Sequence, residues 1–246
     1  MEKIVEICTG SYLDALNAYK GGAKRIELNS ALALGGLTPS LSSLILTKEN
    51  TDLKVICMIR NRAGGFCYDE EEFKQMLLDA KLLLQNGADG LAYGFLNKDK
   101  TIDLYKTDIM TKLVKEFNSE AIFHRAFDIT PNPYRTIEDL IDLKIDRILT
   151  SGQKAKAIDG LDLIKDLQSK YGDKIEILAG SGVNSTNASY IMNYAGISQV
   201  HSSCKNYLND PTTIGKEVNY SYLQSPNEDK YDIVDQNLVK KLINSI

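Results

Sequence analysis

Two carboxylates in apolar surroundings offer the clearest chemistry in this chain. Glu6 and Glu27 stand within the short apolar segments 3–8 and 25–29. A buried carboxylate costs on the order of several kcal/mol unless it is paired, hydrogen-bonded or bound to a metal. These positions therefore predict either catalytic or ligand-binding groups, or structural ion pairs with an arginine such as Arg25.

The chain has only two histidines, and both stand near the ends of apolar segments. His124 falls in segment 121–125 and His201 in segment 199–203. An imidazole changes charge near neutral pH and can also bind a metal, so these positions suit general acid–base catalysis or ligation. The candidate catalytic residues are Glu6, Glu27, His124 and Asp128.

Other polar residues suit the binding of an anion. Arg60 ends segment 54–60, and Gly180-Ser181-Gly182 follows segment 174–179 just before a predicted helix. Backbone N–H groups at such a turn often bind phosphate. The candidate substrate-binding residues are Arg60, Arg125, Thr150, Ser151, Gly180, Ser181, Gly182, His201 and Ser203.

Short apolar strands alternate with amphipathic helices along the chain, a pattern typical of repeated β–α–β units and a parallel sheet. Eight strands are expected, at 3–8, 25–29, 54–60, 90–95, 121–125, 147–150, 174–179 and 199–203. The turn Thr9-Gly10-Ser11 lacks the glycine-rich loop typical of a doubly wound dinucleotide-binding sheet. We therefore predict an α/β fold, a (β/α)8 barrel, with functional residues at the C-terminal strand ends.

The rest of the chain indicates a single domain over residues 1–246. Residues 205–246 are expected to form an irregular C-terminal extension that ends in a closing helix. The net charge of −4 disfavours general binding to nucleic acid or to an anionic membrane. With no signal-peptide pattern and no long apolar run, we expect a cytoplasmic protein. The four cysteines lie far apart, so we expect free thiols rather than a disulfide framework.

Six strings, in order along the chain, closely resemble the CutC copper-homeostasis family. The resemblance covers roughly residues 2 to 204 and implies a cytoplasmic TIM barrel. The strings are Glu6-Ile7-Cys8, Arg25-Ile26-Glu27-Leu28, Gly35-Gly36-Leu37-Thr38-Pro39-Ser40, Met58-Ile59-Arg60, Phe123-His124-Arg125-Ala126-Phe127-Asp128 and Arg147-Ile148-Leu149-Thr150-Ser151-Gly152.

The resemblance also implies a link to copper handling. Cysteines near the first strands are the implied Cu(I) ligands, and thiolates suit this soft ion. Cys8 matches the first of these positions, whereas Asn29 stands where many members have a cysteine. The resemblance implies oligomers as well, so we expect a homodimer.

Three interpretations follow from the residues and the resemblance together. The first is copper handling, with Cys8 as the best ligand and His201 or Cys204 as further ligands. The second is an enzyme that acts on a small anionic or phosphorylated sugar-like metabolite by general acid–base chemistry. The third is a non-catalytic scaffold that oligomerises. The second is compatible with a divalent metal, whose ligands would be Glu6, Glu27, His124 and His201.

Overall fold

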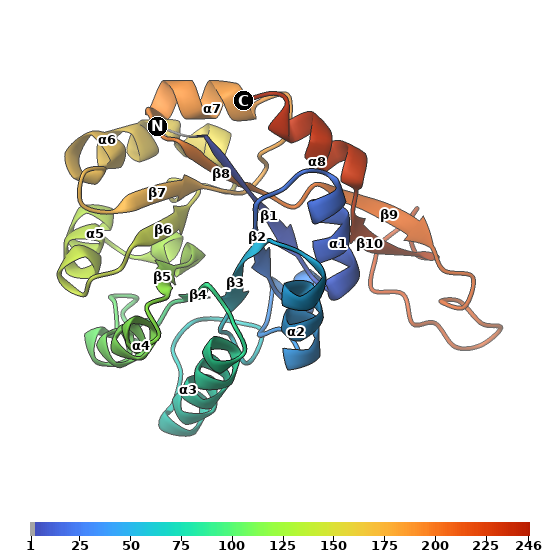
Figure 1. The fold of residues 1–246 in the computed structure, drawn as a ribbon, viewed down its shortest axis with the longest axis horizontal. Helices are drawn as coiled ribbons and strands as arrows, with labels where there is room; N and C mark the ends of the chain where they lie inside the picture. The colour runs from blue at the N-terminus through green and yellow to red at the C-terminus, as the bar shows by residue number, and fades with distance from the viewer. Residues whose placement is uncertain (1–2) are drawn as a thin grey trace.

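Eight parallel strands close into a barrel in the computed structural model, which describes residues 3–246 (Figure 1). Each strand pairs with the next along the chain, and the eighth pairs with the first, which confirms the predicted barrel. The strands are β1 (Ile4–Thr9), β2 (Arg25–Leu28), β3 (Lys54–Met58), β4 (Gly90–Tyr93), β5 (Glu120–Phe123), β6 (Arg147–Thr150), β7 (Glu176–Ala179) and β8 (Gln199–Ser202).

Helices form the outer layer around the strands (Figure 1). In α3, Asp69 and Glu72 form a capping box, and an apolar stripe that includes Phe73 and Met76 is buried against the barrel. The helices are α1 (Tyr12–Lys20), α2 (Leu41–Asn50), α3 (Glu70–Gln85), α4 (Leu104–Glu116), α5 (Pro133–Asp142), α6 (Leu161–Tyr171), α7 (Ala188–Ala195) and α8 (Gln236–Ile243), with short 3-10 turns η1 (Leu32–Leu34), η2 (Arg125–Ile129) and η3 (Ala157–Gly160).

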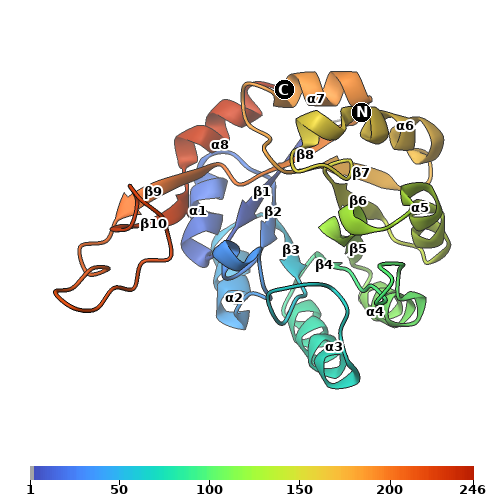
Figure 2. The ribbon, with the colours of Figure 1, turned by 180° about the vertical axis from the view of Figure 1, so that it is seen from behind.

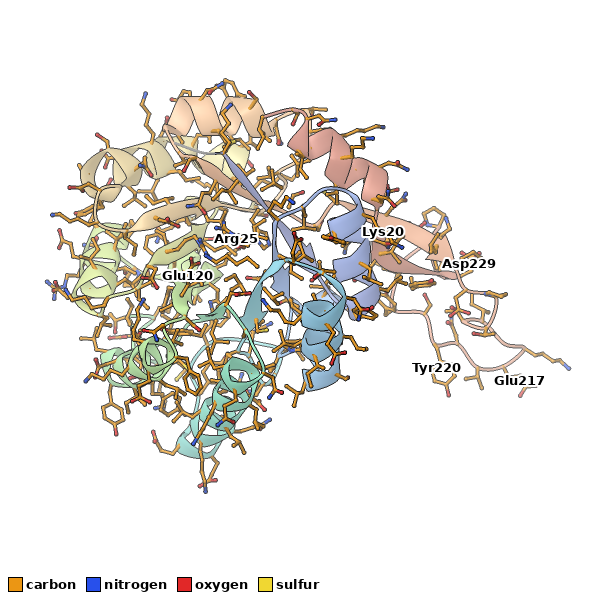
Figure 3. The ribbon with its side chains drawn as sticks, in the orientation of Figure 1. Lys20, Arg25, Glu120, Glu217, Tyr220 and Asp229 are labelled. Carbon is orange, nitrogen blue, oxygen red and sulfur yellow. The ribbon has the colours of Figure 1, made fainter. Side chains whose placement is uncertain are left out.

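A charged layer closes the N-terminal end of the barrel. Arg147 opens β6 and is almost fully buried; its guanidinium pairs with Glu120 at 2.7 Å and with Glu176 at 3.1 Å. Arg25, which opens β2, donates to Gln199 at 2.5 Å. Figure 3 shows Arg25 and Glu120 within the ring of helices. These ion pairs and hydrogen bonds connect β2, β5, β6, β7 and β8 at this end of the barrel.

The C-terminal extension differs in part from the prediction. It contains an antiparallel hairpin of β9 (Lys205–Asn209) and β10 (Lys230–Val234), which the polar and weakly patterned sequence did not reveal. Residues 210–229 connect the two strands as an arm that projects beyond the ring of helices in both views (Figures 1 and 2). Tyr220, labelled on this arm in Figure 3, is 79% exposed. The predicted closing helix is confirmed as α8.

The hairpin is tied to the first helix by Asp14. This carboxylate accepts hydrogen bonds from the backbone N–H of Val234 at 2.8 Å and of Gly10 at 3.0 Å. Asn17, one turn along the same helix, donates to the carbonyl of Val234 at 3.1 Å. The base of the arm is thus held against the barrel. Over residues 3–246, no helix is both long and apolar enough to cross a membrane.

Candidate functional site

A cavity of about 590 Å³ opens at the C-terminal ends of the strands, where a barrel of this type usually carries its functional residues. Nine of the residues singled out from the sequence line it, namely Cys8, Glu27, Arg60, His124, Arg125, Ser181, Gly182, His201 and Ser203. The other six, which do not belong to its lining, are Glu6, Asp128, Thr150, Ser151, Gly180 and Cys204.

Three neighbouring strands bring one thiol, one carboxylate and one imidazole together. Cys8 on β1 is in register with Glu27 on β2, and on the other side β1 pairs with β8, which carries His201. One ligand atom from each of these side chains lies within 4.8 Å of the other two. These spacings are short enough for a single ion to contact all three, so this group is a candidate metal centre.

Glu6 lies behind His201 and orients its ring. The Nδ1 atom of His201 is 2.9 Å from Oε1 of Glu6, which leaves Nε2 on the side of Glu27, at 4.0 Å from Oε2 of that residue. Burial alone would lower the pKa of His201, but hydrogen bonds to Cys8 and Glu6 and the charge of Glu27 raise it well above 6.5. A carboxylate behind a ligating histidine is a common arrangement in metal sites.

Glu6 itself stays ionised because its cationic neighbours outweigh its burial. Its Oε2 atom is 2.7 Å from Nε of Arg25 and 4.0 Å from the guanidinium of Arg147. Burial would raise the pKa of Glu6, but Arg25, the hydrogen bond with His201 and the charge of Arg147 lower it to about 2. A carboxylate held in this way favours positioning over proton transfer at neutral pH.

Asn29 connects the thiol and the carboxylate of the group. Its side-chain amide, which is 1% exposed, donates to Sγ of Cys8 at 3.6 Å and to Oε2 of Glu27 at 3.0 Å. Burial raises the pKa of Cys8 and also that of Glu27. Asn29 therefore acts here as a donor that orients two potential ligands.

Arg60 holds the loops that surround the cavity. Its guanidinium donates to the carbonyl oxygens of Leu34 and Gly36, both at 3.0 Å, and to that of Gly64 at 2.7 Å. Gly36 has a φ of 83°, and a Cβ at this position would lie 2.5 Å from Oδ1 of Asn29. The loop thus approaches the site so closely that only glycine fits there.

Asp128 anchors the loop that follows β6 instead of lining the cavity. Its carboxylate accepts hydrogen bonds from the hydroxyl of Thr150 at 2.5 Å, from the hydroxyl of Ser151 at 2.9 Å and from the backbone N–H of Gln153 at 3.2 Å. It also pairs with Nε of Arg125 at 2.8 Å. Both oxygens are engaged, so this arrangement favours a role in holding Arg125 at the cavity.

The turn after β7 has the strained backbone expected of a tight anion-binding loop. Ser181 and Gly182 have φ values of 82° and 73°, in the left-handed region that favours glycine. The Ser181 hydroxyl donates to the carbonyl of Ala155 at 2.7 Å. Ser203, after β8, lines the cavity beside this turn. Of the turn predicted to bind an anion, Ser181 and Gly182 line the cavity and Gly180 does not.

A family comparison decides the classification of this chain. The model of the CutC family matches residues 3–206. The chain belongs to the CutC family. A CutC family protein of Treponema denticola is 43% identical over 243 residues, which are 98% of each chain. One of Citrobacter koseri is 42% identical over 201 residues, covering 81% of this chain and 79% of the relative.

Solved structures agree with this membership. A crystal structure of a CutC protein from Streptococcus agalactiae, named for a proposed role in copper homeostasis, superposes with a TM-score of 0.77 at 29% identity. The match covers 82% of this CutC-family chain and 98% of that one. Phosphoribosyl anthranilate isomerase from Thermococcus kodakaraensis shares the barrel, with a TM-score of 0.56 at 13% identity over 99% of this chain and 98% of that one. This second likeness concerns the fold alone.

Phe66 and Lys205 are among the cavity residues of this CutC-family protein that were not singled out from the sequence. Phe66 lies in the loop after β3, where no periodic pattern indicates direction, and Lys205 lies just beyond the last expected strand. Lys205 could have been found from its position next to the end of β8. Phe66 carries no comparable signal, because an isolated aromatic residue in a glycine-bearing loop can face either solvent or the core.

Proposed function

We propose that this CutC-family protein binds copper as Cu(I), with Sγ of Cys8 and Nε2 of His201 as its ligands and Glu27 as a third neighbour. The observation that carries the proposal is the orientation of His201. Its Nδ1 is taken by Glu6, and its Nε2 lies 4.0 Å from Oε2 of Glu27, in the residue group that also contains Cys8. The hydrogen bond with Glu6 thus supports an orientation of His201 in which Nε2 faces the thiol of Cys8 and the carboxylate of Glu27.

The donor set fits copper in its chemistry. A thiolate is a soft ligand that favours Cu(I), and an imidazole suits copper in general, whereas a carboxylate is a harder group. Asn29 leaves the group with one thiol, so His201 takes the place of a second sulfur ligand in this proposal. Because Cys8 and His201 must lose their protons to bind, ion binding would release protons and strengthen as the pH rises.

Replacing Cys8 by serine tests this proposal. In an anaerobic Cu(I) titration against a competing chelator, we expect the wild type to bind one ion and Cys8→Ser to lose affinity on the order of 100-fold, because the only thiolate of the group is removed. Cys67→Ser is the matched control, since Cys67 is exposed and lies outside the group. Equal Cu(I) affinities of the wild type and Cys8→Ser would contradict the proposal. A parallel Zn²⁺ titration of the wild type reports whether the site prefers Cu(I) to Zn²⁺.

A second proposed function is an enzyme that acts on a small anionic metabolite in the same cavity. The supporting observation is size: about 590 Å³ lies within the range of about 300–1,000 Å³ typical of small-molecule sites, and an ion needs far less. Glu27, whose pKa is raised by burial, would be the general acid or base. A thermal-shift screen of sugar phosphates and organic acids tests it, and no stabilisation by any such compound would count against it.

A further inference from the structure

Arg60 is a buried cation without an acidic partner in the described part of the chain. The residue is 6% exposed, and its guanidinium donates to three backbone carbonyl oxygens, those of Leu34, Gly36 and Gly64. Its Nε atom is buried and has no hydrogen-bond partner within residues 3–246. A buried charge is costly unless an opposite charge or a full set of hydrogen bonds compensates it. The cavity wall around Arg60 therefore favours an anion.

His124 supplies a second unpaired donor to the same cavity. Its Nδ1 accepts a hydrogen bond from the backbone N–H of Ala126 at 3.2 Å. In a neutral imidazole the other nitrogen then carries the proton, so Nε2 is an N–H donor. This atom is buried and has no partner within residues 3–246. Burial, together with the charge of Arg60, lowers the pKa of His124 to about 3, which keeps the ring neutral.

The surroundings of His124 fix the ring in place. A Cβ at position 94 would lie 2.6 Å from Cε1 of His124, so Gly94 is what allows the ring to pack there. Phe66 contacts both donors: its ring centroid lies 4.8 Å from that of His124 and 5.3 Å from Cζ of Arg60. Phe66 thus holds the two side chains next to each other at one wall.

We propose that His124 and Arg60 form an oxyanion subsite, in which Nε2–H of His124 and Nε–H of Arg60 donate to a carboxylate or phosphate oxygen of a small ligand. His124 acts there as a neutral hydrogen-bond donor that contributes no charge, and Arg60 supplies the charge. The wider lining also holds two cationic side chains, Arg125 and Lys205, whose acidic partners Asp128 and Asp232 stand outside it. This subsite deepens the second proposed function, on which it rests.

The tautomer of His124 can be measured before any ligand is added. With only two histidines in the chain, ¹⁵N-histidine labelling gives two sets of ring signals, and His124→Phe identifies which set belongs to His124. We expect His124 to be neutral at pH 7 with its proton on Nε2. A proton on Nδ1, or a charged ring, would overturn the proposal whatever the ligand screen shows.

Titration with sodium pyruvate and, separately, with inorganic phosphate then tests binding and distinguishes a carboxylate from a phosphate. We expect at least one salt to shift the Nε2–H signal of His124 in a saturable way. His124→Phe should weaken that binding about tenfold, because the ring shape is kept and one donor is lost, whereas His124→Gln, which keeps an N–H donor, should restore most of it. Arg60→Met should abolish binding, with Arg62→Met as the matched control, since Arg62 pairs with Glu72 outside the cavity.

Two results would overturn the subsite. One is that neither salt shifts the His124 signal. The other is that a salt binds the wild type and His124→Phe equally well, as judged for variants with an unchanged thermal midpoint. In the second case an anion still binds in the protein, so the second proposed function would stand while the subsite fails. The opposite case is that no metabolite stabilises the protein but His124 is neutral with its proton on Nε2. That result would count against the second proposed function and leave the donor geometry of His124 intact.

Discussion

Glu6→Gln is expected to lower the free energy of unfolding by about 3 kcal/mol at neutral pH. The variant keeps the shape of the side chain but removes the charge that faces Arg25 at 2.7 Å and Arg147 at 4.0 Å, both of which are buried. It also leaves His201 without a carboxylate at Nδ1, so Cu(I) affinity of the folded variant should fall about 10- to 100-fold. Urea unfolding and the Cu(I) titration measure the two effects separately.

The pH dependence of this effect follows from the pKa of Glu6. Because the folded-state pKa is about 2 and the ordinary value is 4.5, the carboxylate stabilises the fold above pH 4.5, and this contribution is lost as the pH falls from 4.5 towards 2. The stability difference between the wild type and Glu6→Gln should therefore be largest near neutrality and shrink below pH 4.5. Glu116→Gln, at an exposed position, should change stability by less than about 0.5 kcal/mol. A pH-independent difference would contradict this account of Glu6.

Asp128→Ala is expected to lower the free energy of unfolding by about 2–4 kcal/mol. The carboxylate accepts hydrogen bonds from Thr150 and Ser151, which are both fully buried, and from the backbone of Gln153. Without it the hydroxyl of Thr150 and the backbone N–H groups of Ser151 and Gln153 lose their acceptor, while the Ser151 hydroxyl keeps the carbonyl of Lys154. A buried donor left without an acceptor is the costly case for a hydrogen bond. Thermal or urea unfolding of the purified variant measures the loss.

A surface aspartate provides the matched control for Asp128. Asp108 pairs only with Lys112 on the outer face of α4, and Asp108→Ala should change stability by less than about 0.5 kcal/mol. If Asp128 were mainly a catalytic group, Asp128→Ala would leave stability close to that of the wild type. Equal stabilities of the two variants would thus contradict its assignment as a loop anchor.

The barrel could be predicted because its signals are periodic and local. Apolar runs recur at the eight barrel strands, and six of the eight helices, α3 with Asp69 among them, begin at a side-chain cap. The position of Cys8, Glu27 and His201 near one another also follows from the barrel, since strand ends meet at one rim. The sequence was also compatible with a divalent metal held by Glu6, Glu27, His124 and His201. Within residues 3–246, the group whose ligand atoms lie close together consists instead of Cys8, Glu27 and His201.

The roles of individual residues could not be predicted, because they depend on contacts between distant segments. Glu6 and Glu27 look alike in sequence, yet Arg25 and Arg147 keep one ionised while the other faces the cavity. His124 resembles His201, but the N–H of Ala126 fixes its tautomer, and burial together with the charge of Arg60 lowers its pKa and keeps the ring neutral. The hairpin of β9 and β10 was missed because β9 is short and exposed throughout, although Tyr231 and Ile233 of β10 alternate with Lys230 and Asp232. The expected homodimer stays a prediction.

Copper K-edge X-ray absorption of the Cu(I)-loaded protein tests the central claim most directly. The account predicts one sulfur neighbour from Cys8 and one nitrogen neighbour with the scattering pattern of an imidazole, with the sulfur contribution lost in Cys8→Ser and the imidazole contribution lost in His201→Phe. A spectrum that shows only sulfur neighbours, or one that is unchanged in both variants, would contradict a copper centre built on Cys8 and His201.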